Sequence, residues 1–529
     1  MASKVLIADK LSPAAIEIFR ARGIEADVKT GLPPAELRAI IGGYDGLAIR
    51  SATKVTKELL EVAANLKVVG RAGIGVDNVD IKAATAHGVV VMNTPFGNAI
   101  TTAEHAIAMM FALARQLPEA SASTRAGKWE KNRFMGVELT AKTLGIIGCG
   151  NIGSIVADRA VGLKMKVLAY DPFLTDKRAV ELGVEKADLP ELFARSDFIT
   201  LHTPLVDGTR NIINRSTIAA MKPGVRIVNC ARGGLVDEAA LLEGLTSGKV
   251  AGAALDVFEV EPATESPLFA LDTVICTPHL GAATAEAQEN VALQVAEQMS
   301  DYLLTGAVAN AINVPAISAE DAPRVRPYMD LARLLGEFAG QLTQAKDGVV
   351  THVSVEYEGA VAQLNYKPLT AAALAGLMAP MITGANMVNA PVLARERGIE
   401  VTEAVHDRAS EYQTLIRITV ATDGIMRSVA GTLFAGSKPR LVEIKGIPVE
   451  AEFSHHMLYV TNQDKPGFIG RFGATLAGAG INIATFHLGR ASAGGDAICL
   501  VSVDEPVPED VLAMVRTLPL VMQATSLTF

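Results

Sequence analysis

Short apolar runs alternate with amphipathic segments through the first ninety residues of the chain. Strands that take turns with helices favour a parallel sheet with helices on its faces. We therefore expect an α/β unit here, doubly wound around one sheet. The segments with a strand pattern are Val5–Ala8, Gly46–Ile49, Val68–Val69 and Val89–Met92, and Pro13–Ala21 has a helical pattern.

A second alternating block starts near residue 100 with an Ala-rich helical segment, Thr102–Gln116. Six apolar runs follow, with helical stretches between most of them, which is about the strand number of a doubly wound dinucleotide-binding fold. We expect this domain at 98–285, and we group the helical segment Glu286–Leu304 with the first unit, at 1–97 and 286–316. The six runs are Leu144–Ile147, Lys166–Tyr170, Phe198–Leu201, Arg226–Asn229, Gly252–Leu255 and Val274–Cys276.

The remaining chain divides at a Pro- and Ala-rich stretch, Asn313–Pro323. Residues 317–452 give mixed signals and no chemical motif, and we expect an α+β domain that intervenes before the last one. Residues 453–529 follow the order βαββαβ, which is the ferredoxin-like arrangement. Its expected elements are a strand at 456–462, a helix at 467–479, strands at 481–490 and 497–503, a helix at 508–517 and a strand at 520–528.

Composition limits the classes of partner and the location. The 529 residues are half hydrophobic and one fifth charged, which is typical of several compact domains. A net charge of −9 provides no electrostatic footprint for nucleic acid or an anionic membrane, so an anionic substrate needs a local basic pocket. The chain begins Met-Ala-Ser-Lys without a signal-peptide pattern, and no apolar run reaches membrane-spanning length, so we expect a cytoplasmic protein.

The four cysteines are far apart and show no C-x-x-C spacing, so we expect neither a disulfide framework nor a metal site. Cys149, Cys230 and Cys276 stand at the ends of expected strands. A small, buried and reduced thiol is the expected state at each of these three positions.

The strongest local motif is Gly148-x-Gly150-x-x-Gly153, which follows an expected strand and opens an expected helix. The first glycine permits a tight turn, the second admits a pyrophosphate close to the backbone, and the third lets helix and strand pack closely. Phosphates would lie at the helix N-terminus, where free N–H groups favour negative charge. Asp171 ends the next strand, and a carboxylate there binds ribose hydroxyls and repels a 2′-phosphate, so NAD is favoured over NADP.

Three further residues suit hydride and proton transfer, each on a short motif after an expected strand. They are Arg232 in Ala-Arg-Gly-Gly, Glu261 in Glu-Val-Glu-Pro and His279 in Thr-Pro-His-Leu-Gly. His279 suits the proton, Glu261 would orient it, and Arg232 would hold a substrate carboxylate and polarise the oxygen at C2. Taken singly, each has an ordinary structural explanation, but the ends of parallel strands share one ligand crevice. Asp256, also at a strand end, is placed to meet the nicotinamide amide.

These motifs, with Val69–Asp80, Asn98–Glu104, Asn229–Glu238 and Ala254–Phe258, resemble the D-isomer-specific 2-hydroxyacid dehydrogenase family over essentially the whole chain. The similarity is to its long-form members, which add an intervening domain and an ACT domain. It implies a flavodoxin-like substrate domain, a Rossmann NAD domain, and NAD-dependent oxidation of (2R)-3-phosphoglycerate to 3-phosphohydroxypyruvate at the start of L-serine biosynthesis. A side activity on 2-oxoglutarate is also implied, and a homotetramer is the implied assembly.

The resemblance assigns roles residue by residue. Arg232, Glu261 and His279 form the implied catalytic set, and Ile74 replaces a hydroxyl residue that contacts the cofactor phosphate in some relatives. The implied NAD contacts are Gly148, Gly150, Asn151, Ile152, Gly153, Asp171, Thr203, Cys230, Ala231, Asp256, Gly281 and Ala282. The implied substrate contacts are Arg50, Ser51, Arg71 and Asn98, and Lys131 and Arg133 beside Trp129 are weaker candidates for the phosphate.

In similar ACT domains, polar residues at the positions of Asp464 and Asn482 hold an amino-acid effector, and the family implies serine. Asn462 stands where serine-responsive relatives carry an aromatic or histidine side chain, so a domain that serves assembly alone is the alternative. For the whole chain, the alternatives are a glyoxylate or hydroxypyruvate reductase and a non-enzymatic NAD(H)-sensing corepressor. Thr102–Gln116 is apolar on too many faces to remain in water, so we expect a homo-oligomer.

Overall fold

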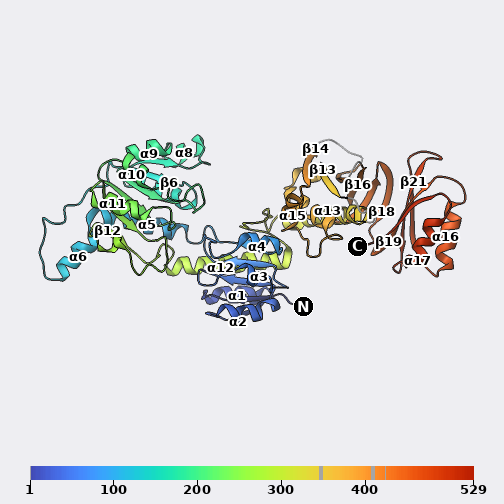
Figure 1. The fold of residues 1–529 in the computed structure, drawn as a ribbon, viewed down its shortest axis with the longest axis horizontal. Helices are drawn as coiled ribbons and strands as arrows, with labels where there is room; N and C mark the ends of the chain where they lie inside the picture. Colours follow the sequence, from blue (N-terminus) through green and yellow to red (C-terminus); the bar gives the residue numbers. More distant parts are fainter. Residues whose placement is uncertain (1, 345–348, 407–411, 423–424) are drawn as a thin grey trace.

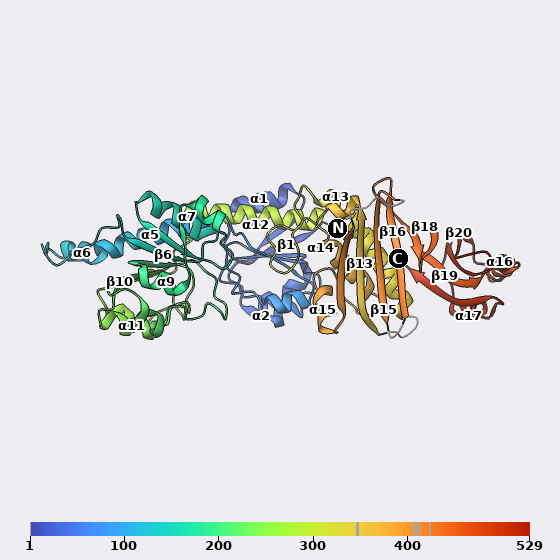
Figure 2. The same cartoon turned by 90° about the horizontal axis from the view of Figure 1, so that it is seen from above.

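The computed structural model describes residues 2–344, 349–406, 412–422 and 425–529. Its strands form four sheets that lie one after another along the long axis of the molecule (Figures 1 and 2). The second sheet in the sequence lies at one end, the first lies beside it, and the third and fourth follow toward the other end. The expected fold class, two doubly wound domains followed by α+β and ferredoxin-like parts, is confirmed.

The first sheet is entirely parallel, with the strand order β2-β1-β3-β4-β5 of flavodoxin-like folds. Alternate residues of its strands face two separate apolar clusters. One includes α1 and α12, and the other includes α2, α3 and α4. The elements are β1 (Lys4–Ile7), α1 (Pro13–Ala21), β2 (Glu25–Val28), α2 (Pro34–Ile40), η1 (Ile41–Gly43), β3 (Gly46–Ile49), α3 (Lys57–Leu60), β4 (Val68–Arg71), α4 (Ile81–Ala86), β5 (Val90–Met92) and α12 (Ala285–Thr305).

The second sheet is also parallel, with the order β12-β11-β10-β9-β6-β7-β8. The chain leaves β6 on one side and returns on the other at β9, so a switch point lies at the glycine turn that follows β6. The elements are α5 (Ala99–Arg115), α6 (Leu117–Arg125), β6 (Thr143–Ile147), α7 (Asn151–Gly162), β7 (Lys166–Tyr170), α8 (Asp176–Leu182), β8 (Glu185–Lys186), α9 (Leu189–Arg195), β9 (Phe198–Leu201), α10 (Arg215–Ala220), β10 (Val225–Asn229), α11 (Glu238–Thr246), β11 (Val250–Leu255), η2 (Pro267–Ala270) and β12 (Val274–Cys276).

The third sheet has the order β14-β13-β15-β16-β17-β18, and all neighbours are antiparallel except the parallel pair β13 and β14. Helices α13 and α14 pack closely at Gly336. A Cβ added there would lie only 2.1 Å from the carbonyl oxygen of Ala373. The elements are α13 (Ala322–Gln344), β13 (Val350–Gly359), η3 (Ala360–Gln363), α14 (Lys367–Met378), α15 (Ala390–Glu396), β14 (Glu400–His406), β15 (Thr414–Thr422), β16 (Ile425–Phe434), β17 (Lys438–Ile444) and β18 (Ile447–Glu452).

The fourth sheet is antiparallel with the order β20-β21-β19-β22, and two helices pack on one face, as expected for βαββαβ. The elements are β19 (His456–Gln463), α16 (Phe468–Gly478), β20 (Ile483–Arg490), β21 (Asp496–Val503), α17 (Glu509–Thr517) and β22 (Val521–Thr528). The four-part division by residue number stays a prediction.

The chain connects the first and second sheets twice. Residues 93–98 lead from β5 into α5, and residues 277–284 lead from β12 into α12, which packs on α1 and β4. The two crossings lie side by side, because Thr101 Oγ1 is 3.4 Å from Thr284 Oγ1 and a Cβ at Gly97 would lie 2.7 Å from Val291 Cγ1.

Candidate active site

The loops after β10, β11 and β12 carry Arg232, Glu261 and His279. These three strands are neighbours and parallel, so their carboxyl ends share one edge of the sheet. Arg50 directly follows β3, and Arg71 is the last residue of β4. The contacts described below join these first-sheet residues to the three loops of the second sheet.

His279 and Glu261 form a hydrogen-bonded pair. His279 Nδ1 lies 2.7 Å from Glu261 Oε2, and Glu261 Oε1 accepts the backbone N–H of Phe258 at 3.0 Å. The His279 backbone is left-handed, with φ of 56°, a conformation that a non-glycine residue adopts at a cost. The imidazole is half exposed, so Nε2 remains on the side away from Glu261 for a reacting group.

Asp256 holds the loop of His279 in this conformation. Its carboxylate is fully buried and accepts hydrogen bonds from Thr277 Oγ1 (2.6 Å), Leu280 N (2.7 Å) and Gly281 N (2.8 Å). His105 Nε2, on α5, lies 3.2 Å from the same carboxylate. Burial raises the pKa of Asp256, but the hydrogen bonds from His105, Thr277 and Leu280 outweigh it, and the net shift is downward. The sequence predicted a nicotinamide contact for Asp256 and missed this loop-holding role.

Arg232 is held from both sides. Its Nη1 donates to the carbonyl of Ala231 at 2.6 Å, and its Nε donates to Asp77 Oδ2 at 2.9 Å. Asp77 belongs to the loop after β4 in the first sheet, 155 residues away in the chain. Sequence reasoning did not single out Asp77, although it lies within the Val69–Asp80 motif.

The basic residues of the two domains converge. Burial, with the positive charges of Arg232 and Arg50, lowers the pKa of the Arg71 guanidinium to about 10. Arg71 Nε is buried and has no hydrogen-bond partner among the described residues, and neither has Asn98 Oδ1. A buried guanidinium nitrogen and a buried amide oxygen without partners indicate a place for a ligand. Ser51 is exposed directly after Arg50, whose backbone N–H donates to Asp9 Oδ2 at 2.6 Å.

The residues after β6 and β7 fit a dinucleotide. Gly148 has a φ of 92°, and a Cβ on it would lie 2.6 Å from the carbonyl oxygen of His202. A Cβ on Gly150 would meet open space, and Gly150 begins α7 without a side-chain cap, so the helix N-terminus stays open to an anion. Asp171 is held beside this turn, because it accepts the N–H groups of Cys149 and Phe173, each at 2.8 Å.

The other residues implied in NAD binding lie at the same edge of the second sheet. Thr203 follows β9, Cys230 and Ala231 follow β10, and Gly281 and Ala282 follow β12. Asn151 and Ile152 begin α7. The structure therefore brings the implied cofactor set to one edge. Cys276 is exposed rather than buried as predicted, because it is the last residue of β12, at the outer edge of the sheet.

Lys131 and Arg133 lie apart from the other basic residues. They follow α6, which projects from the end of the molecule farthest from the fourth sheet (Figures 1 and 2). Arg133 pairs with Glu130 at 3.2 Å and with Asp272 at 3.1 Å. Within one chain they are not brought to Arg50 and Arg71.

The candidate effector residues already have partners within the chain. Asp464 Oδ2 accepts Arg490 Nη1 at 2.9 Å and Gly494 N at 3.1 Å, and both contacts lower the pKa of the Asp464 carboxyl. Asn482 Nδ2 donates to Asp504 Oδ2 at 2.7 Å. Asn462 is buried, and its Oδ1 has no partner among the described residues.

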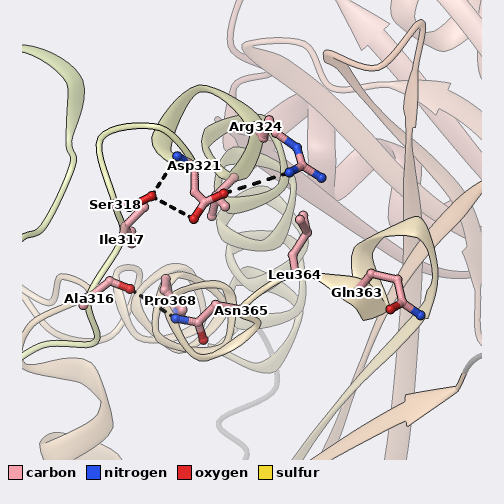
Figure 3. Close-up of a pocket in the computed structure, with 10 residues that line it drawn as sticks. Ala316, Ile317, Ser318, Asp321, Arg324, Gln363, Leu364, Asn365 and Pro368 are labelled. Atoms are coloured by element: carbon pink, nitrogen blue, oxygen red, sulfur yellow. Dashed lines mark hydrogen bonds and ion pairs between the residues drawn. The ribbon is translucent and has the colours of Figure 1, made fainter.

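Two features lie outside this site. A hollow of about 180 Å³ lies where the chain enters α13, between Ser318 with Asp321 on one side and Asn365 on the other (Figure 3). Ser318 and Asp321 bond each other there (2.8 Å), and Asn365 donates to the carbonyl of Ala316 (3.1 Å). Glu356, Glu358 and His406 hold oxygen or nitrogen atoms within 4.8 Å of one another, but Arg417 lies 3.9 Å from Glu356 and supplies a cation.

Family models match three segments of the chain. Residues 107–281 match the D-isomer specific 2-hydroxyacid dehydrogenase NAD binding domain, 324–445 match the D-3-phosphoglycerate dehydrogenase intervening domain, and 456–519 match the ACT domain. The described residues include no helix that is long and apolar enough to cross a membrane.

Relatives match over nearly the full length. D-3-phosphoglycerate dehydrogenase of Methanocaldococcus jannaschii is 43% identical over 98% of this chain and 98% of its own. The Synechocystis protein of the same name is 42% identical over 97% of this chain and 92% of its own. A solved glyoxylate reductase from Paecilomyes thermophila is 30% identical with a TM-score of 0.55, and covers 59% of this chain and 98% of its own. The resemblance inferred from the sequence is confirmed, and the chain belongs to the D-3-phosphoglycerate dehydrogenase family of NAD-dependent D-isomer-specific 2-hydroxyacid dehydrogenases.

Proposed function

We propose that this chain oxidises (2R)-3-phosphoglycerate to 3-phosphohydroxypyruvate with NAD, the first step of L-serine biosynthesis. The observation that carries the proposal is the convergence of Arg50 and Arg71 with Arg232 beside the His279–Glu261 pair. A substrate with a carboxylate at one end and a phosphate at the other needs cations in two places, and a protein with a net charge of −9 supplies them only locally.

In the proposed reaction, His279 Nε2 takes the proton of the C2 hydroxyl while the hydride leaves C2. NAD, when bound, accepts that hydride on its nicotinamide. Glu261 fixes the imidazole through Nδ1 and stabilises the imidazolium that forms. Arg232 holds the substrate carboxylate and polarises the oxygen at C2 as it becomes a carbonyl.

The proposal assigns binding of the substrate phosphate to Arg71 and Arg50, with Ser51 and Asn98 as further hydrogen-bond donors. Arg71 is partly buried and its Nε is unpartnered among the described residues, so an arriving phosphate meets a cation that is poorly compensated. The proposal assigns substrate binding to residues 1–97 and 286–316 and NAD binding to residues 98–285. It assigns the NAD contacts to the glycine turn, Asp171 and the strand-end residues named above.

Two alternatives are less well supported. The glyoxylate reductase structure corresponds to 59% of this chain, whereas the D-3-phosphoglycerate dehydrogenases also match the intervening and ACT segments. A corepressor without activity would not need the buried Arg71 Nε, which has no partner among the described residues, and the ACT segment also argues against it.

The test is turnover with 3-phosphoglycerate and NAD, compared with glyoxylate, hydroxypyruvate and 2-oxoglutarate with NADH. We expect 3-phosphoglycerate to have the highest kcat/KM and 2-oxoglutarate to be reduced slowly. If glyoxylate or hydroxypyruvate is preferred, the reductase alternative replaces the proposal. If no 2-hydroxy or 2-oxo acid reacts, the enzymatic proposal fails.

A homotetramer is part of the proposal. Helix α5 exposes Ile100 and Phe111, and the chain beyond it exposes Trp129 and Met135 by 87% and 77%. Large apolar side chains exposed along α5 and the chain after it support an interface with a second copy. Light scattering gives the mass directly, and a monomer would contradict the proposal. L-Serine as effector at Asp464 and Asn482 and a cytoplasmic location also stay proposals.

A further inference from the structure

The pair Asp77–Arg232 joins the two domains that line the proposed site. Asp77 Oδ2, in the loop after β4, accepts Arg232 Nε, in the loop after β10, at 2.9 Å. Asp77 is 64% exposed, and exposed ion pairs contribute little to folding stability. Its effect is therefore expected at the site rather than in the stability of the fold.

The loop that carries Asp77 is shaped around the guanidinium. A Cβ on Gly75 would lie 1.6 Å from Arg232 Nη2 and 2.8 Å from Arg232 Cζ. The loop thus places a carboxylate at Nε and a residue without a side chain at Nη2. A chance surface contact would not require a residue without a side chain at position 75.

The hydrogen bonds fix which edge of Arg232 is used. Nε is taken by Asp77, and one N–H of Nη1 is taken by the Ala231 carbonyl. No other hydrogen bond to this guanidinium is found among residues 2–344, 349–406, 412–422 and 425–529. The remaining Nη donors form the fork that can bind a carboxylate.

Asp77 also contributes charge. Arg71, Arg232 and Arg50 repel one another, and Asp77 is the acidic group that most favours the cationic form of Arg71. Without Asp77 or a bound anion, this repulsion would favour a wider separation of the guanidinium groups.

We propose that Asp77 is a positioning residue for Arg232: it orients the guanidinium from the opposite domain and offsets its charge until the substrate carboxylate arrives. This inference rests on the proposed role of Arg232. The orientation of Arg232 then depends on the first domain, so the fork is complete only when Asp77 is within reach.

The experiment compares full-length Asp77→Ala, Asp77→Asn and Gly75→Ala with Asp80→Asn. Asp80 carries the same charge on the same loop, caps α4 through Ala83 N, and does not touch Arg232, and asparagine preserves such a cap. Steady-state kinetics with 3-phosphoglycerate, the Kd for NADH by fluorescence, and thermal unfolding are measured for each.

We expect Asp77→Ala to lower kcat/KM by about 100-fold, with a raised KM, because misplacement of a positioned group costs that order. Asp77→Asn keeps an oxygen that accepts the Nε hydrogen bond, so it should lower kcat/KM less than Asp77→Ala does. Gly75→Ala should give the same phenotype, and the double variant Gly75→Ala/Asp77→Ala should lose no more than either single variant. The Kd for NADH, the melting temperature and the Asp80→Asn kinetics should stay near those of the wild type.

The inference is overturned if Asp77→Ala retains the KM and kcat of Asp80→Asn, or if its lost activity equals its lost folded fraction. These outcomes are separate from a failure of the proposed function. If the wild type oxidises a different 2-hydroxy acid, the same variants are compared with that substrate, because any such acid carries the carboxylate that Arg232 binds.

Discussion

The imidazole Nδ1 of His279 and the carboxylate Oε2 of Glu261 lie 2.7 Å apart, on loops that follow neighbouring parallel strands. Glu261 accepts a hydrogen bond from Nδ1–H, which leaves Nε2 without a proton and able to act as the proposed base. The pair therefore sets both the orientation and the tautomer of the ring.

Replacing His279 by alanine should lower kcat by about 100- to 10,000-fold, the usual contribution of a general base. Glu261→Gln should lower kcat less, because the ring keeps a hydrogen-bond partner. Single-turnover kinetics measure the chemical step, and fluorescence titration should show an unchanged Kd for NADH. His455→Ala, directly before β19, is the control. Survival of kcat in His279→Ala would mean that another group takes the proton.

Arg71→Ala should weaken binding of the phosphorylated substrate. The loss of a charge-assisted hydrogen bond of about 2 kcal/mol corresponds to roughly a 30-fold increase in KM for 3-phosphoglycerate. The KM for (R)-glycerate, which lacks the phosphate, should hardly change, and Arg38→Ala on the exposed α2 should affect neither. Equal losses with both acids would assign Arg71 to another part of the substrate.

Asp171→Ala should change the cofactor preference. The carboxylate that repels a 2′-phosphate is removed, so NADP should become usable, while the KM for NAD should rise by about tenfold with the loss of the ribose contact. Asp176→Ala, on the neighbouring helix α8, is the matched control. If NADP remains excluded, another group sets the preference.

The contribution of Asp256 to stability should depend on pH. Its folded pKa is lowered below 3.8, so its stabilisation is present above 3.8 and is lost as the pH falls through the folded value. Asp256→Asn should therefore unfold more easily than the wild type at pH 7, by about 1–3 kcal/mol, and the difference should shrink in acid. Thermal unfolding from pH 7 to pH 3 measures this. A difference that does not vary with pH would show that the charge is unimportant.

L-Serine should bind the fourth-sheet domain with measurable heat and lower the rate of 3-phosphoglycerate oxidation. Asp464→Ala should abolish the heat, and Asp496→Ala, at the exposed start of β21, should not. Calorimetric titration together with the activity assay decides this. A wild type that gives no heat and keeps its rate in serine would leave the domain with assembly alone.

The parts of the fold with strong periodicity were predictable from the sequence. All six predicted strands of the second sheet are present, because most of their residues are apolar and buried on both faces of the sheet. Strands β2 (Glu25–Val28) and β8 (Glu185–Lys186) were missed, because they lie at sheet edges, are largely exposed and have no apolar pattern. No strand of the third sheet was predicted, because the sequence of residues 317–452 gives mixed signals for secondary structure.

The site was predictable as a set of residues but not as a set of contacts. Arg232, Glu261 and His279 are marked by short motifs. The partners Asp77 and His105 become visible only when the loop after β4 and helix α5 are folded against them. Sequence spacing gives no distance between residues 155 positions apart, so these roles required three-dimensional structure.

The two crossings between the first and second sheets lie side by side, so they tie the two domains together along a single line. Two rigid bodies tied together along a single line retain one easy motion, a rotation about that line, whereas sliding and twisting would strain both connections. His279 itself lies in one of these crossings, residues 277–284, so a rotation about this line would move His279 little. We expect such a rotation to shift the proposed phosphate-binding end of the site, at Arg50 and Arg71, more than the proposed proton-transfer end.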